Sequence, residues 1–243
     1  MKQLSLVALH GEKDDPLAGL LDHCRSVVAG SPLGGFFGAY DGAQVHATLV
    51  GMECLPGEPQ INRNVWSKRG LKARMDFSRL REVVGRRLPM SVRFGGFGPD
   101  DRRFDSQGRV PYERSFQIHR ASGKVTLVGW PHEQGDYEPR LLEQLRGDLS
   151  RSCNLEHKYD GDNDLYLVLG VVEQAIAVAG DASAIECAVR DYLLHHPLDV
   201  RLALADVSIA CYADETLDPS TTLAYALADP AVTPDVLEAL YAR

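Results

Sequence analysis

The chain has 243 residues, of which 44% are hydrophobic and 25% are charged, and its net charge is −8. This is an ordinary globular composition, with enough apolar residues for a substantial core. No apolar run approaches the roughly twenty residues that cross a bilayer, and the N-terminal run is too short for a secretory signal, so we expect a cytoplasmic protein with no membrane partner. The acidic total also argues against a protein that coats long nucleic acid, because such binding needs a broad basic surface.

Hydrophobic periodicity predicts an alternation of strands and helices along the chain. In chain order we expect a strand at 3–9, a helix at 15–28, a strand at 44–52, a helix at 76–87, strands at 90–98, 113–120 and 124–131, a helix at 138–152, a strand at 165–173, a helix at 181–196, a strand at 199–213, and two short closing helices at 220–228 and 233–243. Strands and helices in this order predict the α+β class.

Capping residues mark three of these helix starts. Asp15 and Pro16 are expected as the N-cap and first residue of the first helix, and Asp76 as the cap of the second. Thr233 and Pro234 make the same pattern at the last helix.

Two strands invite comparison as an internal duplication. "HATLVGME" begins at His46 and "YLVLGVVE" at Tyr166, and both end in Glu after the same number of residues. Aligned, Tyr166 corresponds to His46 and Val168 to Thr48. Because strand side chains alternate between faces, these four residues lie on the face opposite the apolar rows, where a cleft can form.

The middle of the chain is basic, with sixteen Lys and Arg but six Asp and Glu from residue 60 to 131. It predicts either solvated faces of a helix and hairpin or a field that attracts an anion. Arg93, in strand context, is the residue we would place nearest a bound anion. The five cysteines and eight histidines show neither CxxC nor HExxH spacing, so we expect no metal and no cofactor.

With "VHATLVGME" after the first helix, "LYLVLGVVE" after the third and "DVRLALADVSIACYADETL" near the end, the chain resembles the two-histidine phosphoesterase superfamily. This group includes the 2′-5′ RNA ligase-like proteins and the 2′,3′-cyclic phosphodiesterases. The resemblance implies one bilobal domain over 1–243, with duplicated βαβ-type halves, antiparallel sheets around a central concave cleft and helices on the outer faces. It leaves residues 219–243 as a C-terminal helical extension.

Members of that superfamily carry two His-x-Thr/Ser motifs that face each other across the cleft. To open a cyclic phosphate, one imidazole accepts a proton from water, the other donates one to the leaving ribose oxygen, and the hydroxyls hold phosphate oxygens. His46 and Thr48 match the first motif, whereas Tyr166 and Val168 replace the second. Tyr166 is therefore the candidate partner of His46, and His157 is an alternative that could reach back across a loop.

Three hypotheses follow. The first is a phosphodiesterase that acts on a cyclic phosphate or 2′-5′ phosphodiester of a nucleotide or RNA end through His46, Thr48 and Tyr166. The second is a catalytically degenerate relative that binds a small phosphorylated ligand or RNA end, with Arg93 near the anion. The third is an unrelated α+β protein in which His46 is a satisfied polar residue on a half-buried strand.

Overall fold

The computed structural model describes residues 3–133, 136–137, 140–173 and 179–241. Its main sheet is formed by β1 (Gln3–Ala8), β2 (Phe37–Ala39), β3 (Ala47–Gly51), β6 (Met90–Phe94), β7 (Phe116–Ile118), β8 (Lys124–Glu133), β9 (Asp136–Tyr137), β10 (Leu165–Val172), β11 (Leu198–Leu202), β12 (Val207–Tyr212) and β13 (Leu223–Ala226). A separate hairpin pairs β4 (Cys54–Leu55) with β5 (Glu58–Asn62). The helices are α1 (Leu17–Ala29), α2 (Arg63–Arg69), α3 (Leu80–Arg87), α4 (Pro111–Ser115), α5 (Leu141–Cys153), α6 (Ala179–His195) and α7 (Pro234–Leu240).

The strand order of the sheet is β11-β6-β8-β10-β3-β1-β12-β13, with β2 on β10 and both β7 and β9 on β8. The described strand pairs are antiparallel. The α+β expectation is confirmed at this level, as a mixed fold with an antiparallel sheet. The duplication of its halves stays a prediction.

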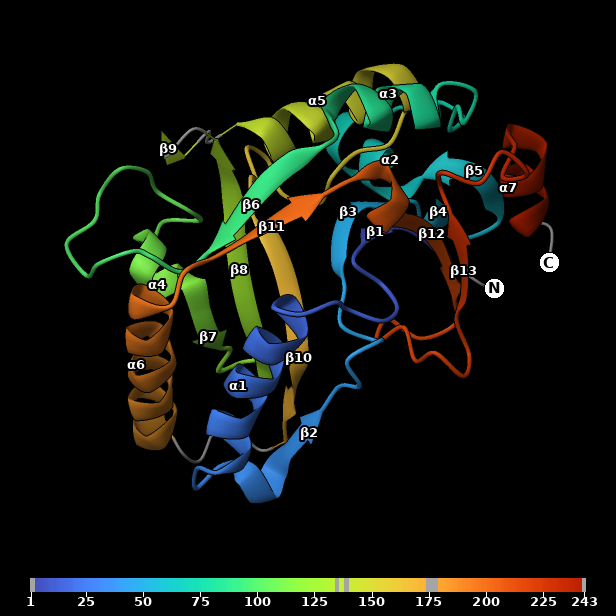
Figure 1. The fold of residues 1–243 in the computed structure, drawn as a ribbon. Coiled ribbons are helices and arrows are strands. Elements are labelled where there is room, and N and C mark those ends of the chain that lie inside the picture. Colours follow the sequence, from blue (N-terminus) through green and yellow to red (C-terminus); the bar gives the residue numbers. More distant parts are fainter. Residues whose placement is uncertain (1–2, 134–135, 138–139, 174–178, 242–243) are drawn as a thin grey trace.

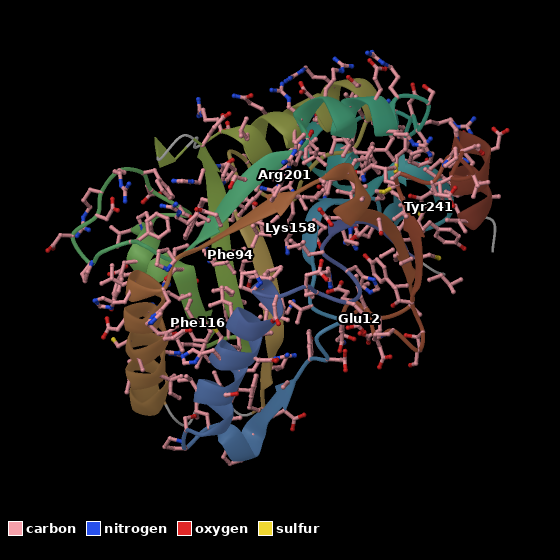
Figure 2. All side chains as sticks on the ribbon, viewed as in Figure 1. Glu12, Phe94, Phe116, Lys158, Arg201 and Tyr241 are labelled. Atoms are coloured by element: carbon pink, nitrogen blue, oxygen red, sulfur yellow. The ribbon has the colours of Figure 1, made fainter. Side chains whose placement is uncertain are left out.

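Helices cover one face of the sheet. Figure 1 shows α1 and α6 next to each other beside β7 and β10, while α3 and α5 run together along the other end. Alternate residues of β3 and β10, such as Leu49 and Leu167, are fully buried in the core under these helices. Phe94 and Phe116, labelled in Figure 2, belong to the same core.

The centre of the sheet is weakly paired. β3 and β10 share one residue pair, Ala47 with Leu167. Beyond it the guanidinium of Arg146 on α5 lies between the two chain segments. It donates to the carbonyls of Thr48 and Leu49, at 3.4 and 3.1 Å, on the β3 side. On the β10 side it reaches the carbonyl of Asp164 at 3.0 Å.

The C-terminal part corrects two predictions. The single strand expected at 199–213 is wrong: a 3₁₀ turn at Leu204–Asp206 divides it into β11 and β12, and the Asp206 carboxylate accepts a hydrogen bond of 2.7 Å from the Ala203 amide. The apolar alternation runs through both strands, so the sequence pattern hides the break. The helix expected at 220–228 is also wrong, because Leu223–Ala226 pairs with β12 as β13.

The helix starts agree in part. Thr233 caps α7 by accepting from the Val236 amide, as predicted. The α1 helix begins at Leu17, with no side-chain cap from Asp15. Asp76 accepts from the amide and hydroxyl of Ser78, which forms a local turn before α3. In the part of the chain that the structure describes, no helix is long and apolar enough to cross a membrane.

Replacing Arg146 tests the importance of the bridge between β3 and β10. We expect Arg146→Ala to lower the free energy of unfolding by about 3–5 kcal/mol, because buried carbonyls lose their donor and the Asp162 carboxylate, 3.0 Å away, loses its arginine partner. Urea unfolding measures the change. Arg151→Ala removes an exposed arginine from the same helix and should change stability by less than about 0.5 kcal/mol. Equal losses in the two variants would contradict the structural role of Arg146.

Candidate functional site

A cleft of about 840 Å³ opens beside β3 and β10, on the face of these strands that points away from their fully buried residues. His46, Thr48, Tyr166 and Val168 all belong to its lining. The structure therefore brings together the three residues that the sequence singled out as catalytic candidates. Their chemical roles stay predictions.

The strand register explains this meeting. Ala47 and Leu167 form the pair between β3 and β10, and both are buried on the core side. Their neighbours point to the opposite face because strand side chains alternate. In antiparallel strands this register places Thr48 next to Tyr166 and His46 next to Val168.

His46 is half-buried, with one ring nitrogen committed. Its Nδ1 lies 2.8 Å from the carbonyl oxygen of Gln44, which can only accept, so Nδ1 carries the proton. In the neutral ring Nε2 then holds a lone pair. Burial, with smaller contributions from His10, Lys13 and Lys124, lowers the pKa of His46 to about 4. At neutral pH the ring is an uncharged proton acceptor.

Across the cleft, Tyr166 contacts a second histidine. Its hydroxyl oxygen lies 3.1 Å from Nε2 of His119, which follows β7. The guanidinium of Arg114 lies 5.4 Å from the centre of the Tyr166 ring. Burial raises the pKa of Tyr166, and the Arg114 charge opposes the shift. Burial lowers the pKa of His119, and the charges of Arg114, Arg109 and Lys124 act in the same direction.

The cations of the cleft differ from the one predicted. Arg93 lies on β6, outside the cleft lining, and its guanidinium binds the Asp199 carboxylate at 2.7 and 2.6 Å. Lys124, at the start of β8, lines the cleft instead. Its charge lowers the pKa of both His46 and His119.

His157 also lines the cleft, on the loop before β10. Its Nε2 lies 2.9 Å from a carboxylate oxygen of Asp162, so Nε2 donates and is held there. Burial lowers the pKa of His157, and the Asp162 hydrogen bond opposes the shift. The contact ties His157 to the same buried carboxylate that binds Arg146.

A separate group of hydroxyls and a carboxylate forms another part of the wall. The Tyr212 hydroxyl donates to Glu53 at 2.8 Å and lies 3.0 Å from the Ser5 hydroxyl. Burial and the Glu53 charge raise the pKa of Tyr212. These residues present acceptors and a neutral phenol, not a positive charge. Among the described residues, no group of three or more His, Cys, Asp or Glu is placed to hold a metal ion.

Sequence reasoning missed His119 and Lys124. Their orientation follows from the alternation of side chains between the two faces of a strand. Val125 and Leu127 are fully buried on the core side, so Lys124 and Thr126 point to the opposite face. His119 continues the same alternation after Ile118, which is also buried. The alternation of apolar and polar residues in this hairpin therefore predicts that His119 and Lys124 lie on the face away from the core.

No protein-family model matches the chain, and no curated protein matches it. Among solved structures, the chain is similar to Usb1 of Kluyveromyces marxianus, with 14% sequence identity and a TM-score of 0.39, over 91% of this chain and 96% of that one.

The low pKa of His46 gives a testable dependence of stability on pH. The folded-state pKa of about 4 lies below the ordinary value of 6.5, so the unfolded chain takes up a proton first as the pH falls. The wild type should lose stability from His46 as the pH falls from about 6.5 to 4. In His46→Gln the loss over this range should be smaller by about 1–3 kcal/mol. Urea unfolding of both proteins at pH 7, 5.5 and 4 measures the difference; parallel curves would contradict it.

Proposed function

We propose that the protein is a phosphodiesterase of the two-histidine type, which hydrolyses a cyclic phosphate or a 2′-5′ phosphodiester of a nucleotide or RNA end. The observation that carries the proposal is that His46, Thr48 and Tyr166 line one cleft from two adjacent strands. The resemblance of the sequence to that superfamily, with His46 and Thr48 matching its first motif, supports the same function.

His46 has the properties of the general base. Its Nε2 is unprotonated at neutral pH, and its Nδ1 hydrogen bond to Gln44 fixes the ring. A water molecule bound between Nε2 and phosphorus would lose a proton to Nε2 while its oxygen attacks phosphorus. The low pKa keeps Nε2 unprotonated, with its lone pair free, over the physiological range.

Thr48 and Lys124 are suited to hold the phosphate. The Thr48 side chain is exposed in the cleft and projects from the same face of β3 as His46. Its hydroxyl can donate to a non-bridging oxygen, and the ammonium of Lys124 can neutralise the charge that develops there. We assign Tyr166, next to Thr48 across the strands, to the side of the leaving group.

The rim of the cleft is suited to a nucleoside. Tyr159 belongs to the lining and is 53% exposed, so its ring offers a face on which a base can stack. Lys158, labelled in Figure 2, is exposed beside it and adds a positive charge for a phosphate further along the chain. Both features favour a nucleotide or RNA end over a simple phosphate ester.

A second candidate function is binding without turnover. Val168 lies next to His46 where the superfamily pattern has a hydroxyl, and it can hold no phosphate oxygen. Tyr166 stands where the second imidazole is expected, and its ordinary pKa near 10 makes it a weaker acid than an imidazolium. The cleft would then hold a phosphorylated ligand through Thr48 and Lys124.

Turnover of a panel of 2′,3′-cyclic nucleotides and 2′-5′ dinucleotides separates the two functions. We expect His46→Ala to lower kcat/KM by about 10²–10⁴, because the general base is removed. His196→Gln, in an exposed position after α6, is the matched control and should leave turnover unchanged. A rate that survives His46→Ala would refute the proposed mechanism.

Binding of the same nucleotides measures the anion site. We expect Lys124→Met and Thr48→Ala to raise Kd about tenfold or more, and added salt to weaken wild-type binding, because a charge contact contributes. Arg201→Met removes an exposed arginine from β11, outside the cleft lining, and should bind like the wild type. Binding with no turnover in any nucleotide would select the second candidate function.

A further inference from the structure

We infer that His119 and Thr126 make Tyr166 the proton donor to the leaving group, so that a cluster from three strands replaces the missing second histidine. This inference rests on the proposed hydrolysis at the cleft. It assigns positioning roles to two residues outside the His46 and Thr48 motif.

The strand register brings the three residues together. Thr126 on β8 pairs with Val168 on β10, and Gln117 on β7 pairs with Thr126. The Thr126 hydroxyl therefore lies beside Val168, the position that has no hydroxyl of its own. His119 follows two residues after Gln117 and points to the same face.

We assign the hydrogen of the neutral His119 ring to Nε2 from the hydrogen bonds of Thr126. The Thr126 hydroxyl donates its one proton to the carbonyl of Gln117, at 3.3 Å. Its oxygen also lies 3.3 Å from Nε2 of His119, and with the hydroxyl proton on the Gln117 carbonyl this contact is a hydrogen bond in the tautomer that carries the hydrogen on Nε2. The Thr126 side chain is fully buried, so water does not compete for these contacts.

The same N–H group reaches the Tyr166 oxygen, 3.1 Å from Nε2. The phenol then accepts from His119 and keeps its own proton for a group in the cleft. In the other tautomer, with the hydrogen on Nδ1, the phenol would instead donate its proton to Nε2 of His119. His119 thus orients the Tyr166 hydroxyl toward the substrate.

The proton count of the reaction closes with this arrangement. Water gives one proton to Nε2 of His46 as its oxygen bonds to phosphorus, and the bond from phosphorus to the leaving ribose oxygen breaks. Tyr166 gives its proton to that oxygen, and the N–H of His119 and the nearby Arg114 stabilise the phenolate. After product release the imidazolium of His46 gives a proton to solvent, and the phenolate takes one from it.

The test compares two substrates with different leaving groups. A 2′,3′-cyclic nucleotide expels a ribose alkoxide, which needs a proton, whereas the 4-nitrophenyl phosphodiester of the same nucleoside expels a stable phenolate, which does not. We expect Tyr166→Phe and His119→Ala to lower kcat/KM about 10²–10³-fold on the cyclic nucleotide and less than about threefold on the nitrophenyl ester. His46→Ala should lower both, because both reactions need the base.

A conservative variant separates positioning from simple packing. His119→Gln keeps an N–H that can donate to the Tyr166 oxygen, so it should recover at least about tenfold of the activity that His119→Ala loses on the cyclic nucleotide. Thermal unfolding of each variant reports any loss of folded protein. His195→Gln, an exposed histidine at the end of α6, is the control and should match the wild type on both substrates.

The results of these assays either support or overturn the inference. Selective loss on the cyclic nucleotide with recovery in His119→Gln supports the inference. Equal loss on both substrates, or no loss in His119→Ala, overturns it while leaving the hydrolysis itself established by the wild-type rate. A wild type that turns over neither substrate overturns the proposed function and the inference with it.

Discussion

The structure depends on a single buried guanidinium at the point where its sheet comes apart. β3 and β10 share one residue pair. Beyond that pair, Arg146 of α5 donates hydrogen bonds to backbone carbonyls on both sides. It also donates to the Asp162 carbonyl at 2.8 Å, so the loop before β10 is tied to the same group. The strands can diverge without leaving buried carbonyls unpaired, because the arginine satisfies them. If β3 and β10 were paired along their whole length, the sheet would leave less room for a cleft.

That divergence also sets the electrostatics of the cleft. His46 lies on β3 and Tyr166 on β10, on the face away from the core, and both are half-buried. Burial favours the uncharged form of each, which lowers the pKa of the imidazole and raises the pKa of the phenol. The result is an uncharged acceptor on β3 and an uncharged donor on β10, with Lys124 supplying a positive charge in the same cleft. Such a pair can move protons at neutral pH without first neutralising a charge.

The alternation of apolar and polar side chains predicted more of the structure than any other feature of the sequence. It placed His46, Thr48 and Tyr166 on one face, and it gave the central strands and most helices, because apolar periodicity is local information. It failed at the turn Leu204–Asp206, where a side-chain hydrogen bond interrupts an unbroken apolar pattern. It also misplaced Arg93, since pairing with Asp199 on a neighbouring strand depends on a register that a single sequence does not display. His119 was readable in principle, from the parity of its hairpin, but its meeting with Tyr166 required the order of β7, β8 and β10.

The two halves of the cleft are built differently, and this has a physical consequence. On the β3 side the base and the phosphate-holding hydroxyl come from one strand, two residues apart, so their relative geometry is set by strand alternation alone. On the β10 side the corresponding groups come from three strands, with the Thr126 hydroxyl fully buried between them. The donor geometry therefore depends on the register of the β7–β8 hairpin against β10. Gly123 makes the turn of that hairpin with a φ of +68°, a conformation that favours glycine, and its carbonyl accepts from the amide of Val172 at 2.9 Å. The turn thus anchors the hairpin to β10 and fixes the register that places His119 beside Tyr166.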